Sequence, residues 1–444
     1  MFKTRLGALR QSQMRKSFVM WPKTLILYVS ISVIAVKSYK FPPGFKFGAA
    51  TSAYQIEGSW NVSDKSPSVW DHFIHSKPER IQDFSSADIA CDSYNNWHRD
   101  VEMAEELGLH FYRFSLSWTR LMPLGYPHKI SKAGKDYYNN LINALLAKKI
   151  EPVITMYHWD LPQSLQNLGG WANPQSIEWF NDYARAVFSL FADRVKTWIT
   201  FNEPVAFCDF SFNSGIHAPG VVIPGIGSYV CNKNVLMAHA KTWRMYDKEF
   251  RPKYQGKISI ANFLTWMEAE KEQDEETAEF ARELVLGMYT YPIFSKEGGW
   301  PPLVENHVRE KSKMEGWPKS RLPDFTQEEK EFVKENGYAD IDPDLSDINR
   351  VLYYKDHLEQ VLLSINEDNI NVMSYTAWTL MDNFEWAFGY KLKFGLYHVD
   401  FEDPKRTRRP RASAEFYKRV IRQHSRSNHR HRHRHSHLHR SHRL

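Results

Sequence analysis

The sequence predicts an α/β fold, a (βα)8 TIM barrel, and two observations predict it. From about residue 41 to residue 420, short and nearly continuous apolar runs alternate with helical stretches. Such runs are typical of parallel strands buried on both faces, and repeated βα units indicate a parallel barrel or a doubly wound sheet. The runs end in polar or aromatic residues. This favours the barrel, because catalytic groups of (βα)8 barrels lie at the carboxyl ends of the strands.

The expected elements follow one another along the chain. The strands are 44–53 (GFKFGAATSA), 109–118 (LHFYRFSLSW), 151–159 (EPVITMYHW), 195–204 (VKTWITFNEP), 256–263 (GKISIANF) and 371–382 (NVMSYTAWTLMD). Expected helices include 94–107, 134–147 and 175–191. The strands finish near Gln55, Trp118, His158, Asn202 and Trp378. The sequence contains no Gly-rich nucleotide loop, no HExxH and no CxxC, so we expect neither a cofactor nor a metal.

Composition fits a large globular domain. The 444 residues suit one large barrel or two to three ordinary domains, and a mean hydropathy of −0.54 argues against several membrane spans. The formal charge of +6 comes from the last 21 residues, which contain six Arg and no acid; without them 52 basic residues face 52 acidic ones. We therefore expect no nucleic-acid partner.

The two ends of the chain differ from the body. Residues 1–38 are predicted to be a basic leader plus a signal peptide, because the uncharged, mostly apolar run 24–36 is thirteen residues long, too short to cross a bilayer but suited to a signal-peptide core. We expect cleavage between Ala35 and Tyr39 and a secreted protein without a stable membrane span; a retained anchor is the weaker alternative. The barrel spans 39–422. The His/Arg-rich tail, 423–444, is expected to be disordered and solvated, and metal binding by its histidines is the weaker interpretation.

Cysteine usage fits an oxidising compartment. Cys208 and Cys231 flank a Gly/Pro-rich loop that a disulfide would restrain. Cys91 is left over and is expected to be a buried thiol. Asn61 begins an Asn-Val-Ser glycosylation sequon, which matters only in a secreted chain.

Two glutamates stand in positions that suit acid–base chemistry. Glu203 closes a strand in TFNEP, and Glu335 precedes an Asn-Gly turn in ENGY. Retaining glycosidases need two carboxylates about 5–5.5 Å apart, one as nucleophile and one as acid/base. The acid/base needs a raised pKa to protonate the leaving oxygen.

Together with their flanking motifs, these glutamates make the sequence resemble glycoside hydrolase family 1, the β-glucosidases and their myrosinase-like and lactase-like relatives. The resemblance runs from about residue 40 to residue 422. Its motifs are FKFGAATSAYQIEG (45–58), YRFSLSW (112–118), YHWDLP (157–162), TFNEP (200–204), ENGY (335–338), WTLMDNFEW (378–386) and FGLYHVDF (394–401). The resemblance implies a retaining β-glycosidase that hydrolyses β-D-glucosides or oligosaccharides through a glycosyl-enzyme intermediate.

The resemblance also assigns catalytic residues. Glu203 corresponds to the acid/base and Glu335 to the nucleophile. Arg113 corresponds to the arginine beside the nucleophile, where a cation would keep a carboxylate ionised; an ordinary structural ion pair is the alternative for Arg113.

Six further residues are implied in sugar binding. Gln55, His158, Asn202 and Glu385 would meet the ring hydroxyls, Trp378 would stack under the ring, and Trp386 would donate its N–H. Outside its motif, His158 would more often be a core histidine. The carboxylate of Glu385 would repel a phosphate, so we expect a neutral sugar. Glu203, where glucosinolate-cleaving plant enzymes have Gln, makes an O-glycoside the default substrate.

The chain departs from the family between Lys334 and Glu335, which are joined directly. The sixth and most of the seventh strand unit are absent, roughly seventy to ninety residues at about 30 or more per βα unit. The barrel should then be incomplete, with unpaired edges, and hydrolysis weak or absent. Either an exon of an active enzyme has been skipped or misassembled, or a real variant has lost activity. The first is favoured, because every other site position is kept.

A non-catalytic carbohydrate-binding or receptor module, as in klotho-type relatives, is the alternative function. Such relatives typically lose one catalytic glutamate, whereas Glu203 and Glu335 are both present here. The sequence does not specify the aglycone, the choice between glucose and galactose, or the oligomeric state.

Overall fold

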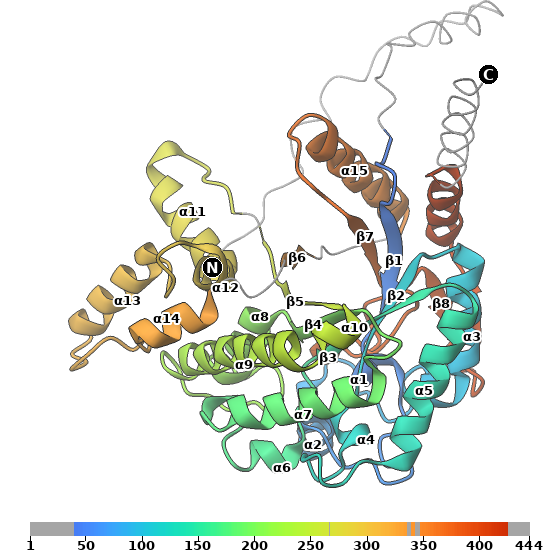
Figure 1. Cartoon of the computed structure of the whole chain (residues 1–444), viewed down its shortest axis with the longest axis horizontal. Helices are drawn as coiled ribbons and strands as arrows, with labels where there is room; N and C mark the ends of the chain where they lie inside the picture. Colours follow the sequence, from blue (N-terminus) through green and yellow to red (C-terminus); the bar gives the residue numbers. More distant parts are fainter. Residues whose placement is uncertain (1–39, 266, 335–338, 342–346, 425–444) are drawn as a thin grey trace, which may run out of the picture. The chain divides into compact units, whose positions relative to one another are not determined.

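A parallel sheet organises the protein in the computed structural model, which describes residues 40–265, 267–334, 339–341 and 347–424 (Figure 1). Its seven strands are ordered β6-β5-β4-β3-β2-β1-β7. They are β1 (Lys46–Ala50), β2 (Phe111–Ser115), β3 (Glu151–Tyr157), β4 (Thr197–Asn202), β5 (Lys257–Asn262), β6 (Ala339–Ile341) and β7 (Ser374–Trp378). All six expected strands are confirmed; β6 was not expected.

Burial explains why these runs are apolar throughout. β2 is buried along its whole length, and β3 and β4 are buried except at their first residue. Four residues on neighbouring strands β2 to β5 form a buried cluster separate from the main core: Phe111, Val153, Ile199 and Ala261. Such a layer is expected of residues that fill the inside of a curled parallel sheet.

Helices follow most strands. The expected helices are confirmed as α3 (Ser93–Leu107), α5 (Lys132–Ala147) and α7 (Ser176–Phe191). The others are α1 (Ala53–Ile56), α2 (Val69–Ser76), α4 (Trp118–Leu121), α6 (Gln163–Gln166), α8 (Pro204–Phe212), α9 (Gly227–Glu249), α10 (Arg251–Tyr254), α11 (Glu275–Arg282), α12 (Met288–Phe294), α13 (Pro302–Met314), α14 (Gln327–Val333) and α15 (Asp347–Asn366). A π-helical turn, η4 (Glu283–Gly287), joins α11 to α12, and a short 3-10 helix, η5 (Trp386–Phe388), follows β7. A separate antiparallel pair is made by β8 (Tyr397–Val399) and β9 (Arg408–Pro410).

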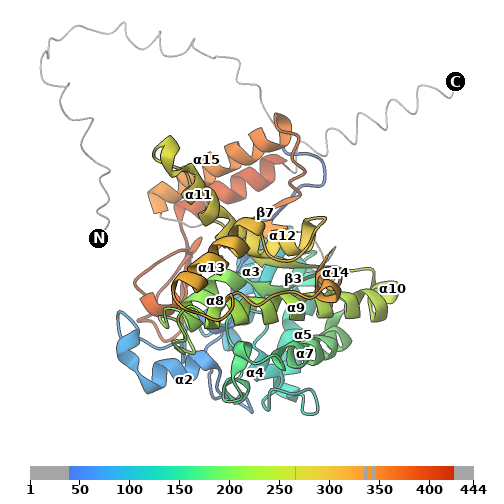
Figure 2. The ribbon, with the colours of Figure 1, turned by 90° about the vertical axis from the view of Figure 1, so that its left-hand side faces the viewer.

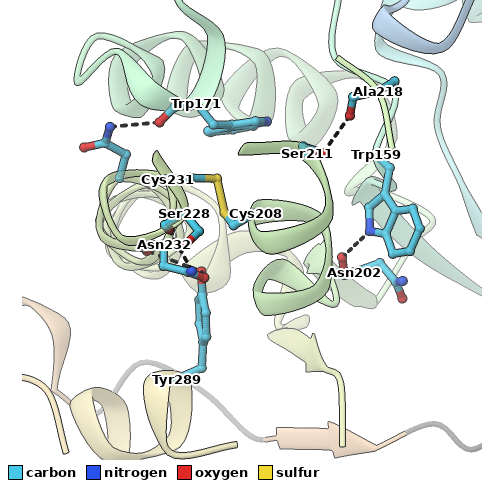
Figure 3. Close-up of a disulfide and its surroundings, with 11 residues drawn as sticks. Trp159, Trp171, Asn202, Cys208, Ser211, Ala218, Ser228, Cys231, Asn232 and Tyr289 are labelled. Atoms are coloured by element: carbon cyan, nitrogen blue, oxygen red, sulfur yellow. Dashed lines mark hydrogen bonds between the residues drawn. A yellow bond between two sulfur atoms is a disulfide. The ribbon is translucent and has the colours of Figure 1, made fainter. Parts of the chain in front are cut away.

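A disulfide ties α8 to α9 (Figure 3). Cys208 and Cys231 are bonded, 23 residues apart in sequence, and both are buried. The third cysteine, Cys91, is a fully buried thiol. The pairing and the leftover thiol were both expected, and both are confirmed.

The sheet does not close into a complete barrel. Within the described ranges, β6 pairs only with β5, and β7 pairs only with β1. Helices α11 to α14 come between β5 and β6 in the sequence, and Figures 1 and 2 show them near one another. Helix α14 contacts α9. The expected incompleteness is therefore confirmed, because a closed barrel would pair the strands at its two edges.

Several predictions lie outside the described residues. These are the leader with its cleavage site, most of the tail, and Glu335. Within the part of the chain that the structure covers, no helix is long and apolar enough to cross a bilayer.

Candidate active site

Glu203 stands directly after β4, in a backbone conformation that non-glycine residues rarely adopt. Its φ of 46° and ψ of 60° are left-handed, and Pro204 begins α8 immediately afterwards. The backbone N–H of Glu203 donates a 2.8 Å hydrogen bond to the carbonyl of Ala261 at the end of β5. Two other residues at this rim, Trp159 and Trp386, also have positive φ. Such conformations cost free energy and cluster at functional sites, where surrounding structure holds them.

Asn202 is oriented by two neighbours. The guanidinium of Arg113, a buried residue of β2, donates to the Asn202 side-chain oxygen and, through Nε, to Thr155 Oγ1 at 3.0 Å. The Trp159 indole N–H donates to the Asn202 carbonyl at 2.9 Å (Figure 3). Because the side-chain oxygen accepts from Arg113, the amide nitrogen of Asn202 is the end that faces away from the guanidinium and can donate elsewhere.

His158 is a buried, neutral imidazole at the end of β3. Burial, and then the charge of Arg113, hold the pKa of His158 well below its ordinary value. Its ring lies nearly parallel to those of Trp378 and Trp386, with centroids 5.7 and 5.9 Å away. Nδ1 is buried, and no described residue bonds to it. A neutral imidazole offers one donor and one acceptor, the pattern that a hydroxyl group matches.

Gln55 joins the first and last parts of the fold. Its buried side-chain amide donates to Asn383 Oδ1 and to the Phe384 carbonyl, each at 3.0 Å. The same nitrogen lies 3.3 Å from the carboxylate of Glu385. These contacts link α1 to the segment after β7, although more than 320 residues separate them in sequence.

Aromatic rings pack beside these polar groups. Trp386 is buried, with its ring centroid 4.7 Å from that of Trp159 and 4.8 Å from that of Trp70. Trp378 ends β7, opposite Ala50 of β1, and is partly exposed. An exposed aromatic face beside polar groups is what stacking on a sugar ring requires.

The structure thus brings together eight of the nine predicted site residues, which lie on five strands, β1 to β4 and β7, or on the segments that follow them: Gln55, Arg113, His158, Asn202, Glu203, Trp378, Glu385 and Trp386. The ninth, Glu335, lies outside the described residues, just past Lys334, which caps α14. In the parts of the chain that are placed, no group of three or more His, Cys, Asp or Glu side chains could hold a metal.

A cavity of about 530 Å³ lies beside α8, the helix that begins directly after Glu203. Val205 and Ala206, which follow this glutamate closely, line it together with apolar side chains from α8, the end of β5 and α11 to α13. Asp209, His307 and Arg321 add polar groups to the wall. The cavity is therefore mixed in character and large enough for a small organic group.

Sequence reasoning missed three residues that hold the site together. Thr155 and Trp159 position Arg113 and Asn202, and Asn383 accepts from Gln55. Trp159 and Asn383 belong to the motifs YHWDLP and WTLMDNFEW, so their position near the site could have been predicted from the sequence. Thr155 could have been found only from the register of β2 and β3. These strands are direct neighbours, which brings Thr155 close to Arg113.

Comparison with known proteins gives one family. The sequence pattern of glycosyl hydrolase family 1 matches residues 37–337 and 330–426. Myrosinase 1 of Brevicoryne brassicae is 38% identical over 461 aligned residues, which span 86% of this chain and 98% of the myrosinase. Human cytosolic β-glucosidase is 36% identical over 467 aligned residues, which span 88% of this chain and 99% of the β-glucosidase. The solved structure of aphid myrosinase superimposes with a TM-score of 0.81 at 37% identity, over 86% of this chain and 99% of that chain.

The same comparisons agree with a missing segment. The two family matches overlap at 330–337, around the Lys334–Glu335 junction. Of the 444 residues, 86% is about 382, so about 79 of the 461 positions aligned with the aphid myrosinase have no residue in this chain. This agrees with the length expected for two lost βα units.

Proposed function

This chain belongs to glycosyl hydrolase family 1. We propose that it binds β-D-glucosides at a site with the residues of a retaining glycosidase, in which Glu203 is the acid/base and Glu335 is the nucleophile. One observation carries the proposal: Glu203 and Asn202 share one rim with Arg113, His158 and Trp378, contributed by four different strands or their ends. Residues from separate strand ends that converge on one rim are the usual origin of catalytic sites on this architecture.

In this mechanism the nucleophile attacks the anomeric carbon while the acid/base protonates the leaving oxygen, giving a covalent glycosyl-enzyme. Water, deprotonated by the same acid/base, then attacks the anomeric carbon and releases the nucleophile. Asn202, with its oxygen engaged by Arg113, would present its amide nitrogen to the sugar 2-hydroxyl. Hydrogen bonds at that position strengthen in the transition state.

The polar groups favour a neutral sugar. Gln55 and Glu385 are held next to each other, so a donor and an anionic acceptor meet at one place. A carboxylate there suits hydroxyl groups and repels a phosphate ester. Glucose 6-phosphate should therefore bind at least about tenfold more weakly than glucose. Because Glu203 can protonate an oxygen leaving group, an O-glycoside is the preferred substrate.

The cavity beside α8, the helix that follows Glu203, favours a partly apolar leaving group. Phe210 and Phe263 line it, and so do Val205 and Ala206. Apolar surface removed from water contributes about 25 cal/mol per Å² to binding. An aromatic or alkyl aglycone should therefore bind more tightly than a sugar aglycone.

The open sheet limits catalysis. Glu335 follows the end of α14 and not a strand paired on both sides. A misplacement of about 1 Å can reduce catalysis about a hundredfold. We therefore expect sugar binding to persist while hydrolysis by this chain is at least about a hundredfold slower than that of a member with all eight strands.

The test separates binding from turnover. Calorimetry should detect glucose binding that Trp378→Ala reduces at least about tenfold, whereas Trp317→Ala, at a tryptophan outside the site, leaves it unchanged. Glu203→Gln should abolish residual turnover of p-nitrophenyl β-D-glucoside and leave the glucose Kd within about threefold. Turnover at the rate of a complete relative would contradict the expected loss, and equal effects of Trp378→Ala and Trp317→Ala would contradict the site itself.

A non-catalytic carbohydrate-binding role is the second candidate, favoured by the unclosed sheet next to an assembled set of sugar-binding residues. The two functions differ in one outcome. A binding module would show no turnover even at high protein concentration, so Glu203→Gln would have no activity to reduce.

We also propose that the chain is secreted. The apolar run 24–36 after a basic leader supports this, and so does the Cys208–Cys231 disulfide, since disulfides persist in oxidising compartments. Expression in secretory cells should yield protein in the medium that begins between Ala35 and Tyr39. Retention of the full leader in the cytosol would contradict the proposal.

A further inference from the structure

A small polar cavity lies behind the sugar-binding residues. Its volume is about 10 Å³, and its wall includes Tyr54, Glu57, Lys65, Asp71, Arg120 and Asp160. A cavity of this size holds about one water molecule, provided that two to four polar groups face it. The residues come from α1 and the turn after it, the loop before α2 and the first turn of α2, α4, and the loop after β3.

Three of these side chains keep unused hydrogen-bonding atoms. Asp160 is 1% exposed, and neither carboxyl oxygen has a partner in another described residue. The same holds for the hydroxyl of Tyr54 and for Nη1 of Arg120, both on buried side chains. A buried polar atom without a partner costs free energy comparable to a lost hydrogen bond. Three such groups around one cavity therefore point to a shared ligand.

Apart from Nη1 of Arg120 and the Asp160 carboxyl, the charged groups around the cavity have hydrogen-bond partners. Arg120 donates through Nε to Glu57 at 2.8 Å and through Nη2 to the Gly58 carbonyl at 2.9 Å. Lys65 donates to Asp71 at 2.9 Å. The two cations and these two carboxylates cancel, so only an uncharged Asp160 leaves the cluster neutral. Burial, and then the negative charge of Glu57, raise the pKa of Asp160 to about 8, which agrees with this count.

We propose that this cavity is a binding site for one structural water molecule, held by the Asp160 carboxyl, Arg120 Nη1 and the Tyr54 hydroxyl. Water can accept from the guanidinium and donate to the carboxyl at the same time, so it matches all three groups. A metal cation does not match them, because the Nη1–H of Arg120 cannot act as a ligand and its charge would repel the ion.

The site would fix two parts of the sugar-binding rim to each other. Tyr54 precedes Gln55 in α1, and its ring lies parallel to that of Trp386 with centroids 6.1 Å apart. Asp160 follows His158 by two residues in the loop after β3. A water bonded to both segments would act as a cross-link between them. Asp160 is thus a positioning residue and does not itself touch the sugar.

Two substitutions of Asp160 test the site by the sign of a melting-temperature shift. Asp160→Leu keeps the size and removes the acceptor. With a bound water, it leaves Arg120 Nη1 and Tyr54 without a complete network and lowers the Tm by about 3–6 °C. With a dry cavity, the same change removes an unpaired buried carboxyl and raises the Tm. Asp160→Asn keeps a donor and an acceptor, so at pH 6 it should not lower the Tm.

A control and a direct observation complete the experiment. Asp182→Leu, at a half-exposed aspartate on α7, measures the effect of the same substitution at a solvated position and should shift the Tm by less than about 1 °C. A crystal structure of the full chain should place a solvent oxygen within about 3.2 Å of the Asp160 carboxyl, Arg120 Nη1 and the Tyr54 hydroxyl. An empty cavity, or a Tm that rises in Asp160→Leu, would overturn the proposal even if one variant does not fold.

Discussion

Two regions of this fold differ in how firmly their residues are fixed. The first, which we call the glycone half, comprises β1 to β5 with α1 to α10, and β7 with the segment after it. The second, the connecting region, is the chain from 263 to 373. In the glycone half α7 buries eight of its residues, whereas in the connecting region α11 and α14 bury one residue each. Buried apolar area is the main source of stability. The proposed sugar-binding residues thus stand on the more deeply buried half, and the predicted nucleophile, Glu335, belongs to the connecting region.

Three residues with strained backbone conformations lie close to the candidate site. Glu203, Trp159 and Trp386 hold left-handed backbone conformations, each inside the glycone half. Such conformations persist only where neighbouring packing holds them. The comparison therefore predicts that a barrel can lose two strand units and still keep a preformed sugar site, while losing the geometry that bond cleavage needs.

The largest stability difference between the regions should appear in a matched pair of substitutions. Phe180→Ala on α7 removes a fully buried ring whose centroid lies 4.2 Å from that of Phe201, and should cost about 3–5 kcal/mol. Phe280→Ala on α11 removes a partly buried ring that packs on His307, and should cost about 1 kcal/mol. Urea unfolding measures both. Equal losses would show that the two regions are equally packed.

A pH effect should arise from Asp160 in the glycone half. With a folded pKa of about 8, Asp160 stays protonated in the native protein between about pH 4 and pH 8, whereas the unfolded chain has released this proton. Its contribution to stability therefore falls as pH rises through this window, by up to about 1.4 kcal/mol per pH unit. Relative to the unchanged chain, Asp160→Asn should gain stability between pH 5 and pH 8. A constant difference across this range would contradict the raised pKa.

The disulfide lies where the glycone half meets the connecting region, and it should be worth about 3 kcal/mol, because the Cys208–Cys231 link closes a loop of 23 residues. A Cys208→Ser/Cys231→Ser double variant should unfold at correspondingly lower denaturant concentration. Cys91→Ser, at a buried thiol outside the disulfide, controls for cysteine replacement. If reduction of the unchanged chain has no effect on unfolding, the disulfide does not stabilise this junction.

The smallest expected effect is on sugar affinity. Arg113→Lys keeps the charge and loses the guanidinium contacts to Thr155 and Asn202. Because these charge-assisted bonds orient the Asn202 amide, glucose should bind about tenfold more weakly. Arg309→Lys, on an exposed arginine of α13, should leave the Kd unchanged. An unaltered glucose Kd in Arg113→Lys would contradict the proposal that the Asn202 amide contributes to glucose binding.

Much of the glycone half was readable from sequence, because its strands are continuous apolar runs that end in motif residues. The runs around Arg113, His158 and Asn202 predicted both the strands and the rim on which those residues meet. The grouping of Tyr54, Arg120 and Asp160 was not readable, since only the fold brings segments up to 106 residues apart around one cavity. Nor was β6, whose three residues pair with β5 in a chain that lacks the strand units that the family has between them. Local patterns specify elements, whereas closure and polar clusters depend on distant parts of the chain.

The most direct measurement compares this chain with a version whose sheet can close. The segment that human cytosolic β-glucosidase has at this junction would be inserted between Lys334 and Glu335, and both proteins assayed with p-nitrophenyl β-D-glucoside and titrated with glucose. Insertion should raise turnover at least about a hundredfold and change the glucose Kd by less than about threefold. Equal turnover by the two proteins, or glucose binding that appears only after insertion, would contradict the claim that the glycone half is complete and the nucleophile is not.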